Sequence, residues 1–239
     1  MKIQYFFSSP HGDIPLEPAQ RALPFKVTPT REHPLLTLGD YFDALGRFLL
    51  KAGGGDLLRL LEKEASRPIS FSQIEEIRIC SEKHGTLYHI ARVEIQADDR
   101  VYPFAVTSTV SPDARAHLAL ETAVMQSLER SFDFDYLPKF FYGDAVTLQT
   151  GKGKVDLTIL IGEWFEGYHE WHHRFDEKGR NHRICIWDQK NGHRFATDHE
   201  TFEIFRQASR ILTLYYEPDT YCQIYPWHHA AGDFVVRTR

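Results

Sequence analysis

The fold of this chain is decided by the stretch "TLYHIARVEIQADDRVYPFAVTST", residues 86–109. Every second residue from Leu87 to Ile95 is apolar or a histidine, and a period of two is typical of a β-strand with one buried face. The short polar run 97–99 allows a turn, and residues 100–109 have the composition of a second strand. The stretch therefore predicts an antiparallel pair of strands, with Pro103 favouring an edge or a bulge in the second one.

The residues around this pair extend it into a larger unit. A helix follows, because Ser111 can cap a helix and Pro112 suits the first helical position. Glu121 falls among apolar residues on one stripe of this helix, so we expect its carboxylate to point inward with them. The predicted elements are strands at 74–82, 86–96 and 100–109, a helix at 111–131, and strands at 137–148 and 155–167.

The flanking segments are less regular. Residues 1–36 contain six prolines and little periodicity, so we expect an extended arm that lies on the body of the protein. Two helices are predicted over residues 38–65, separated by the three glycines at 53–55. The predicted elements toward the C-terminus are a hairpin at 182–197 around Asn191-Gly192 and a helix at 199–217 capped by Asp198.

Composition excludes several classes of protein. The chain of 239 residues has a net charge of −5 and no run rich in lysine or arginine, so we expect no nucleic-acid partner. The first residues lack the apolar stretch of a signal peptide, and no window approaches 18 apolar residues, so we expect no membrane partner. The three cysteines are far apart and form no CxxC pair, which indicates buried free thiols in a cytoplasmic protein.

The order of the predicted elements resembles the protein-kinase-like fold, especially its aminoglycoside and choline phosphotransferase branch. The resemblance covers roughly residues 74–239. It implies an α+β protein with a five-stranded antiparallel small lobe, one packed helix, a partial helical lobe and an N-terminal helical extension. The expected domains are 1–73 as arm and helical extension, 74–167 as small lobe and hinge, and 168–239 as partial helical lobe with a degenerate catalytic loop.

The stretch "LTILIGEWFEGYHEW" (157–171) resembles the fifth strand and hinge of that branch, where an apolar strand runs into an acid and then a glycine. In such folds the hinge backbone hydrogen-bonds an adenine ring. The resemblance therefore implies that Glu163, Trp164 and Phe165 contact a nucleotide. The alternative is a buried strand that ends in a turn.

The stretch "YPWHHAAGDFVVR" (225–237) resembles the family's catalytic loop, in which a metal-binding asparagine follows the catalytic aspartate by five positions. The alignment implies that Asp233 stands at the metal position and His228 at the position of the catalytic aspartate. A neutral histidine there could act as a general base or could block the site. The family's next magnesium-binding acid would lie beyond residue 239, so either the sequence is a truncated form or that strand pair is absent.

Other positions depart from the family as well. Glu121 matches the family's helix glutamate, but Thr107 stands where its lysine partner belongs, and no lysine occurs between residues 84 and 138. We expect Arg92 to replace that lysine beside Glu121; the alternative is that Glu121 lies in water at the edge of the helix. The turn that covers the phosphates in the family offers only Gly85, which suits a tight turn better than a phosphate cradle.

Two short motifs need separate interpretations. The "HGD" at 11–13 copies the start of the phosphotransferase loop, but it lies in the proline-rich arm and is interpreted as a chance match. The "HEWHH" at 169–173 satisfies HExxH and would suit a zinc hydrolase if it were helical. Since its surroundings favour no helix, the alternative is a group of histidines packed on Trp164, Trp171 and Phe175.

Three functional hypotheses follow. The first is a degenerate, pseudokinase-like protein that binds a nucleotide or a protein partner without ordinary phosphoryl transfer. The second is a small-molecule phosphotransferase that uses ATP and Mg²⁺, with His228 as base and Asp233 as metal ligand. The third is a non-enzymatic interaction module that uses the arm and exposed aromatic residues.

Overall fold

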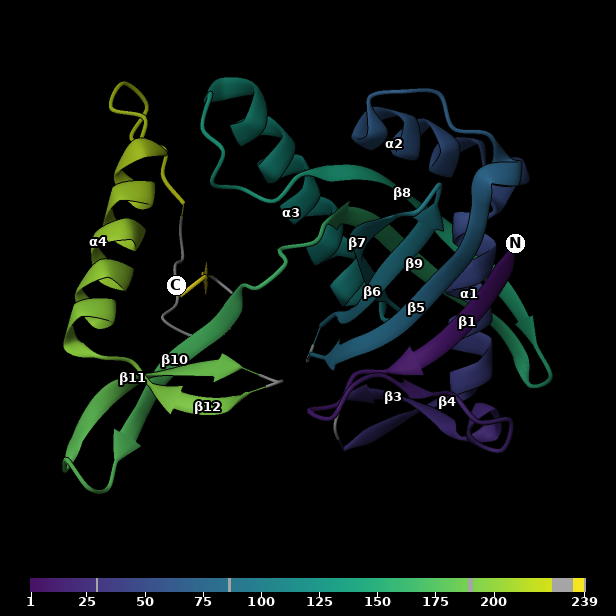
Figure 1. Cartoon of the computed structure of the whole chain (residues 1–239), viewed down its shortest axis with the longest axis horizontal. Helices are drawn as coiled ribbons and strands as arrows, with labels where there is room; N and C mark the ends of the chain where they lie inside the picture. The colour runs from purple at the N-terminus through teal and green to yellow at the C-terminus, as the bar shows by residue number, and fades with distance from the viewer. Residues whose placement is uncertain (29, 86, 189–190, 225–233, 239) are drawn as a thin grey trace. The chain divides into compact units, whose positions relative to one another are not determined.

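The computed structural model describes residues 1–28, 30–85, 87–188, 191–224 and 234–238 (Figure 1). The chain forms two compact units. The first unit contains residues 1–8, 13–127 and 137–164, and the second unit contains residues 9–12, 128–136 and 165–239. The border after Trp164 falls inside the segment 163–167, which the resemblance assigns to a hinge.

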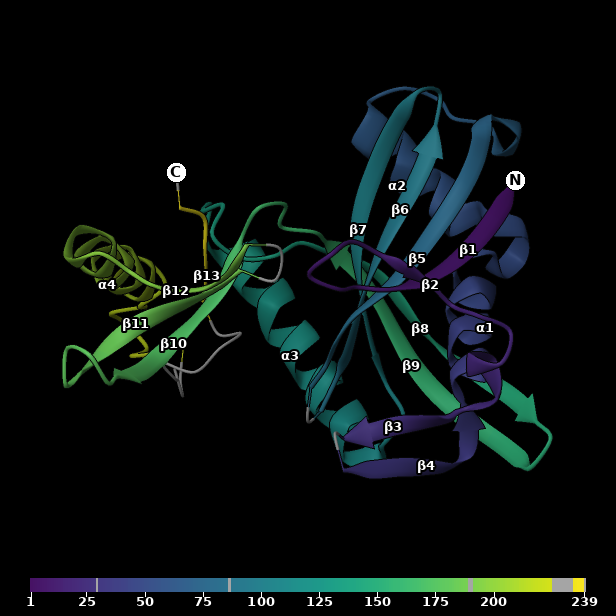
Figure 2. The same cartoon turned by 60° about the horizontal axis from the view of Figure 1, so that its bottom comes forward.

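The first unit is built on a seven-stranded sheet with the strand order β2-β1-β5-β6-β7-β9-β8 (Figure 2). The pairs β5–β6, β6–β7, β7–β9 and β9–β8 are all antiparallel, so the predicted strands 74–82, 86–96 and 100–109 form a meander. Strand β9 lies between β7 and β8, so the strands after the helix join the meander at β7. The bounds are β1 Lys2–Phe7, β2 Ile14–Pro15, β5 Ile74–His84, β6 His89–Ala97, β7 Arg100–Thr109, β8 Phe140–Thr150 and β9 Gly153–Glu163.

The expectation of a five-stranded, fully antiparallel sheet is wrong, because the arm adds two strands. Strand β1 pairs with β5 in parallel, and β2 adds to β1 in antiparallel fashion. The stretch "KIQYFF" alternates, and Ile3, Tyr5 and Phe7 pack against the hydrophobic core. The prolines of the arm come after this strand and do not interrupt it. The rest of the arm includes a ribbon of β3 (Pro24–Thr28) and β4 (Arg31–Thr37).

One hydrophobic core joins the N-terminal helices to the sheet. Alternate residues of β6, from His89 to Ala97, are at most 2% exposed, as the period of two predicts. They pack with apolar residues of α1 (Leu38–Leu49) and α2 (Gly55–Ala65). Between the helices, φ is +71° at Gly53 and +77° at Gly54, a conformation that glycine adopts without steric cost. The prediction of two helices separated by glycines is therefore confirmed, and both share a core with the strands.

The helix between β7 and β8 is α3 (Pro112–Ser131). Its buried residues are Ala114 and Leu118, both in its first half. Glu121 is exposed, so the prediction that its carboxylate points inward is wrong. The helix is only weakly amphipathic, and Glu121 lies at the edge of its apolar stripe. None of the helices in the described part of the chain, α3 included, is long and apolar enough to cross a lipid bilayer.

In the part that the structure describes, the second unit contains a four-stranded sheet, ordered β12-β11-β10-β13, and the helix α4 (Asp198–Leu214). The expectation of a partial helical lobe over 168–239 is wrong for these residues. Trp171, Ile184 and Ile186 alternate along two strands and pack with Ile204 of α4, which explains why a sheet forms. The strand bounds are β10 His169–Asp176, β11 Asn181–Asp188, β12 Gly192–Phe195 and β13 Val235–Val236.

The "HEWHH" motif lies on strand β10 and not on a helix. Four residues of strand separate His169 from His173 by roughly 13 Å, whereas one helical turn would bring the two rings together. The zinc-hydrolase interpretation of this motif is therefore wrong. The predicted hairpin is present, since β11 pairs with β12 and Asp188 lies opposite Gly192.

Side chains fix the start of α4. The Thr197 hydroxyl accepts a hydrogen bond from the Glu200 N–H at 3.2 Å, and Glu200 Oε2 accepts one from the Thr197 N–H at 2.8 Å. The cap is therefore Thr197, and the prediction of Asp198 is wrong by one residue. Arg194 Nη1 also donates to Glu200 Oε2, at 2.9 Å. This hydrogen bond, helped by those from Thr197 and only partly opposed by burial, lowers the pKa of Glu200 to about 2.

We predict that Glu200→Gln loosens the first turn of α4 at pH 7 but not near pH 2. The pKa of Glu200 is lower in the folded chain than its usual 4.5, so the carboxylate stabilises the fold above about pH 4.5. This contribution is lost as the pH falls toward 2. We expect a loss of about 1 kcal/mol at pH 7, measured by hydrogen exchange over the first turn of α4.

Glu203→Gln is the matched control, because it removes an exposed pair with Arg206 on the same helix. It should change the exchange rates less than Glu200→Gln does. Equal protection of the wild type and Glu200→Gln at pH 7, or a difference that persists at pH 2, would contradict the prediction.

Candidate functional site

The strand period of two places a set of polar side chains on the face of the sheet opposite the core. On β5 this face carries Arg78, Cys80 and Glu82, each of which follows a buried residue. On β6 it carries Arg92 and Glu94, which alternate with buried apolar residues. Cys80 lies opposite Arg92, and Arg78 lies opposite Glu94. Five ionisable side chains therefore lie together on two adjacent strands.

Arg92 is the centre of this group. Its side chain is 14% exposed, and its Nε donates to Glu82 Oε1 at 2.7 Å. Its Nη2 donates to both carboxylate oxygens of Asp13, at 2.9 and 3.0 Å, and its Nη1 donates to Glu94. The ring centroid of Trp164 lies 5.9 Å from the guanidinium carbon. Since Asp13 comes from the loop before β2, segments far apart in the sequence hold one guanidinium group.

The charge of Arg92 is secured by its neighbours. Burial alone would lower the pKa of Arg92, but the hydrogen bond to Glu82 and the charges of Glu94, Glu82 and Asp13 outweigh it and raise the pKa. A planar guanidinium has five N–H donors and can therefore serve several carboxylates at once, which a lysine ammonium cannot do in the same geometry. The carboxylates of the protein therefore already neutralise the positive charge of Arg92.

A second arginine extends the group. Arg78 Nη2 donates to Asp13 Oδ2 at 3.3 Å, and Arg78 Nη1 lies 3.9 Å from Glu94 Oε2. The Arg78 guanidinium carbon also lies 4.5 Å from the ring centroid of Phe6. Three carboxylates and two guanidinium groups leave one net negative charge. The arginine–carboxylate network consists of Asp13, Arg78, Glu82, Arg92 and Glu94.

Cys80 lies beside this network as a protonated thiol. It is 2% exposed, and its Sγ donates to Asp13 Oδ1 at 3.4 Å. Burial raises the pKa of Cys80, and the charges of Glu82 and Asp13 raise it further, against the smaller opposing effect of Arg92. Because the thiolate is the reactive form, a buried thiol with a raised pKa is a poor nucleophile. The site therefore does not suit nucleophilic catalysis by cysteine.

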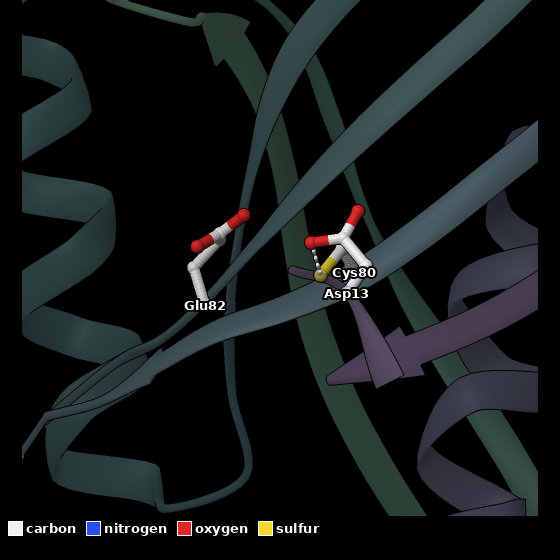
Figure 3. Close-up of side chains that lie close together, drawn as sticks. All are labelled: Asp13, Cys80 and Glu82. Atoms are coloured by element: carbon white, nitrogen blue, oxygen red, sulfur yellow. Dashed lines mark hydrogen bonds between the residues drawn. The ribbon is translucent and has the colours of Figure 1, made fainter. Parts of the chain in front are cut away.

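Asp13, Cys80 and Glu82 could hold a metal ion, since one ligand atom of each lies within 4.8 Å of the other two. Figure 3 shows Asp13 and Cys80 in contact, with Glu82 further along β5. One thiolate and two carboxylates would suit Zn²⁺. Binding would require the Cys80 proton to leave and Arg92 to release its carboxylates. The residues as arranged fit a guanidinium group better than a metal ion.

The expected pair of Arg92 and Glu121 is not formed. The Glu121 carboxylate lies within hydrogen-bonding reach of the Tyr88 hydroxyl, and burial followed by the charge of Glu121 raises the pKa of Tyr88. Arg92 is bound instead by the nearer carboxylates of its own and the adjacent strand. Cross-strand neighbours in a sheet are closer than a helix that crosses it, which explains the difference.

Two other expected nucleotide contacts lie near this face. Thr107 is half-buried on β7, opposite Ile90 in the register, and shares the polar face with Arg92. The Gly85 N–H donates to the Tyr88 carbonyl oxygen at 2.9 Å, and a Cβ at Gly85 would lie 2.9 Å from that oxygen. Gly85 therefore forms a tight turn.

Glu163 ends β9, and its backbone and side chain both contact Lys139. The Glu163 N–H donates to the Lys139 carbonyl oxygen at 2.9 Å, and Glu163 Oε2 accepts from the Lys139 N–H at 3.3 Å. Its carboxylate thus has a structural partner. Of the three expected hinge contacts, Trp164 is the one that the structure brings to Arg92.

The remaining expected residues lie elsewhere in the chain. Phe165 begins the second unit, where its ring centroid lies 5.3 Å from that of Tyr168. His228 and Asp233, the expected base and metal ligand, lie outside the described residues, as does all of the segment 225–233.

Sequence reasoning misses the carboxylates around Arg92. Asp13 belongs to the "HGD" motif interpreted as a chance match, and its position depends on the pairing of β1 with β5. A signal for Glu82 and Glu94 is present in the sequence, because charged residues that alternate with buried ones on adjacent strands predict cross-strand ion pairs. That signal predicts a network of cross-strand ion pairs, but it does not identify Asp13 as the third carboxylate.

We predict that Arg92→Gln destabilises the first unit by about 3 kcal/mol, because it leaves the nearly buried Glu82 carboxylate without its arginine and removes hydrogen bonds from Asp13 and Glu94. Arg67→Gln is the matched control: Arg67 Nη2 lies 2.8 Å from Asp98 Oδ2, and both side chains are exposed. Loss of that surface pair should cost less than about 1 kcal/mol. Urea unfolding measures both variants. A loss for Arg92→Gln no larger than that of Arg67→Gln would show that the network contributes little.

The same variant tests the metal site. Without the guanidinium group, we expect Zn²⁺ to raise the melting temperature of Arg92→Gln more than that of the wild type, because Asp13, Cys80 and Glu82 become available as ligands. Adding Cys80→Ser to the variant should remove this effect. An equal Zn²⁺ shift in wild type and Arg92→Gln would contradict the competition between metal and arginine.

Comparisons with known proteins identify no relative. No protein-family model, no curated protein and no solved structure matches the chain. Its function has to be inferred from its own side chains.

Proposed function

We propose that this chain is a degenerate kinase-like protein that binds a protein partner and does not transfer phosphoryl groups. The strand order supports the kinase-like part of the proposal. Along the chain, β5, β6 and β7 are followed by α3 and then by β8 and β9, which is the order of elements on which the resemblance rests. The added strands β1 and β2 and the sheet of the second unit are departures from that family.

Phosphoryl transfer in this family requires a lysine beside the phosphates. A glutamate of the helix holds this lysine in place. The corresponding strand position carries Thr107, which has no charge. The helix carboxylate, Glu121, lies beside the Tyr88 hydroxyl rather than a cation. The lysine that neutralises phosphates is thus replaced by an uncharged residue, and the helix glutamate lies beside a hydroxyl group instead of holding that lysine.

The observation that carries the proposal is that Arg92 is bound to three carboxylates. A nucleotide triphosphate that approached the polar face would meet Asp13, Glu82 and Glu94 around the one central arginine. Two like charges 4 Å apart repel each other by about 1 kcal/mol in water and about 4 kcal/mol near a protein surface. Since the network carries one net negative charge, it favours cationic groups over phosphates. We therefore expect ATP, and the Mg²⁺ that would enter with it, not to act as cofactors.

A partner role is also supported by the surface of α3. Leu120 is 64% exposed and Val124 is 48% exposed, and residues four apart lie on one face of a helix. Adjacent exposed apolar side chains are typical of surfaces that contact other proteins. The phosphotransferase alternative depends on His228 and Asp233, which lie outside the described residues.

A nucleotide-binding experiment tests the proposal. The melting temperature of the full chain is measured with millimolar ATP, with and without Mg²⁺ or Mn²⁺, and ADP release is followed in the same samples. We expect neither a shift nor ADP. Inorganic triphosphate serves as the control for phosphate binding without the base. A shift that requires Mg²⁺, together with ADP release, would overturn the proposal in favour of the phosphotransferase.

A further inference from the structure

The outer side of β1 is only partly paired (Figure 2). Strand β2 covers its end at Phe6 and Phe7, and the last bond of this hairpin runs from the Leu16 N–H to the Tyr5 carbonyl oxygen at 2.9 Å. Alternate residues of a strand direct their backbone groups to the same side, so the N–H and C=O of Ile3 point outward as those of Tyr5 do. No described residue pairs with Ile3 on that side. An unpaired strand edge can accept another strand.

A groove of about 360 Å³ adjoins this edge. Ile3 and Tyr5 of β1 form one wall, and α1, which lies beside β1 in both views, forms the other (Figure 1). The residues that line the groove from the side of α1 are three and four positions apart, on one face of the helix and its C-cap: Asp43, Gly46, Arg47 and the capping residue Leu50. Every second side chain of a strand added to β1 would point toward this groove.

Gly46 lets α1 and β1 approach each other closely beside the groove. A Cβ at Gly46 would lie 3.1 Å from Tyr5 Oη and 3.9 Å from Ile3 Cδ1. Glycine inside a helix costs about 1 kcal/mol relative to alanine, so its presence calls for a packing or functional reason. Here the missing side chain makes room for the hydroxyl of Tyr5, which lines the groove.

Arg47 gives the groove an unneutralised positive charge. Asp43, on the same helix face, is bound by Arg21, whose Nη2 donates to both carboxylate oxygens at 2.8 Å. Arg47 is exposed, and no carboxylate in the described part of the chain forms an ion pair with it. The groove is thus locally positive on a chain with a net charge of −5. Its complement is an acidic group.

We propose that this groove binds an extended, acidic segment of a partner protein. The segment adds a strand to the outer edge of β1 at Ile3, places an apolar side chain beside Leu50 and aligns a carboxylate with Arg47. Main-chain hydrogen bonds give affinity in this mode of recognition, and side chains in the groove give selectivity. The proposal does not rest on the kinase-like interpretation, because no residue of the arginine–carboxylate network takes part.

Fluorescence anisotropy with a labelled peptide tests it. The probe is a capped hexapeptide of alternating valine and glutamate, and its counterpart carries lysine in place of glutamate. We expect the glutamate peptide to bind the full chain and the lysine peptide to bind at least about tenfold more weakly, because Arg47 repels it. Amide chemical shifts should change along β1 and α1 on binding.

Variants separate charge from strand pairing. Arg47→Glu should weaken binding of the glutamate peptide about tenfold and favour the lysine peptide. Arg59→Glu, at an exposed arginine of α2, should leave both affinities unchanged. Ile3→Pro removes an outward N–H that the sheet does not use, so it should abolish binding while the circular dichroism spectrum stays that of the folded chain. If Ile3→Pro does not fold, Gly46→Ala replaces it: its Cβ would lie 3.1 Å from Tyr5 Oη, so it should displace the Tyr5 side chain that lines the groove and weaken binding several-fold.

The outcomes are distinct. Loss of binding in Arg47→Glu and in Ile3→Pro or Gly46→Ala, with normal binding in Arg59→Glu, would support the proposal. It is overturned by absence of binding at millimolar peptide, by equal affinity for the two peptides, by unchanged binding in Arg47→Glu, or by shift changes confined to another strand such as β8.

Discussion

Strand β6 contributes apolar side chains to the core and charged side chains to the opposite face of the sheet, because successive side chains of a strand point in opposite directions. Ala91, Val93 and Ile95 are fully buried beneath the N-terminal helices, whereas Arg92 and Glu94 lie on the opposite face. A shift of the register by one residue would drive the arginine into the core and expose the apolar residues, so the pairing with β5 and β7 is strongly specified. The position of the arginine–carboxylate network follows from this register, and so does the distance from Arg92 to Trp164.

Local patterns explain which parts of the fold could be predicted. The alternation of β6, the glycine break before Gly55 and the β11–β12 hairpin are each encoded within a few residues, and all three are present. The pairing of Lys2 with Glu76 is not encoded in this way, since "KIQYFF" predicts a strand but not its neighbour or direction. The motif "HEWHH" is compatible with helix or strand on its own, and the packing of Trp171 with residues of β11 and α4 decides for the strand.

In the candidate site, too, some features follow from local sequence patterns and others depend on the pairing of distant strands. Arg92 could be selected from the sequence as a cation of this region, and Trp164 as a residue of the segment after β9, but not as neighbours. Its actual partners could not all be selected, because Asp13 reaches the site only after β1 has joined the sheet. An arginine bound by three carboxylates rigidifies a sheet face and leaves little positive potential for phosphates. The same residue type that could replace a catalytic lysine therefore has the opposite effect here.

The position of β1 also has consequences for synthesis of the chain. This strand leaves the ribosome long before β5, its partner in the sheet, and the intervening residues must first be made. Closing a loop of that length is entropically unfavourable, whereas the β5–β6–β7 meander has short connections and can form without it. Until then the β5 side of "KIQYFF", a short segment rich in β-forming residues and free of proline, remains unpaired in the nascent chain. Chaperones that bind extended segments would find an early target there, and the same segment is a risk for aggregation between newly made copies.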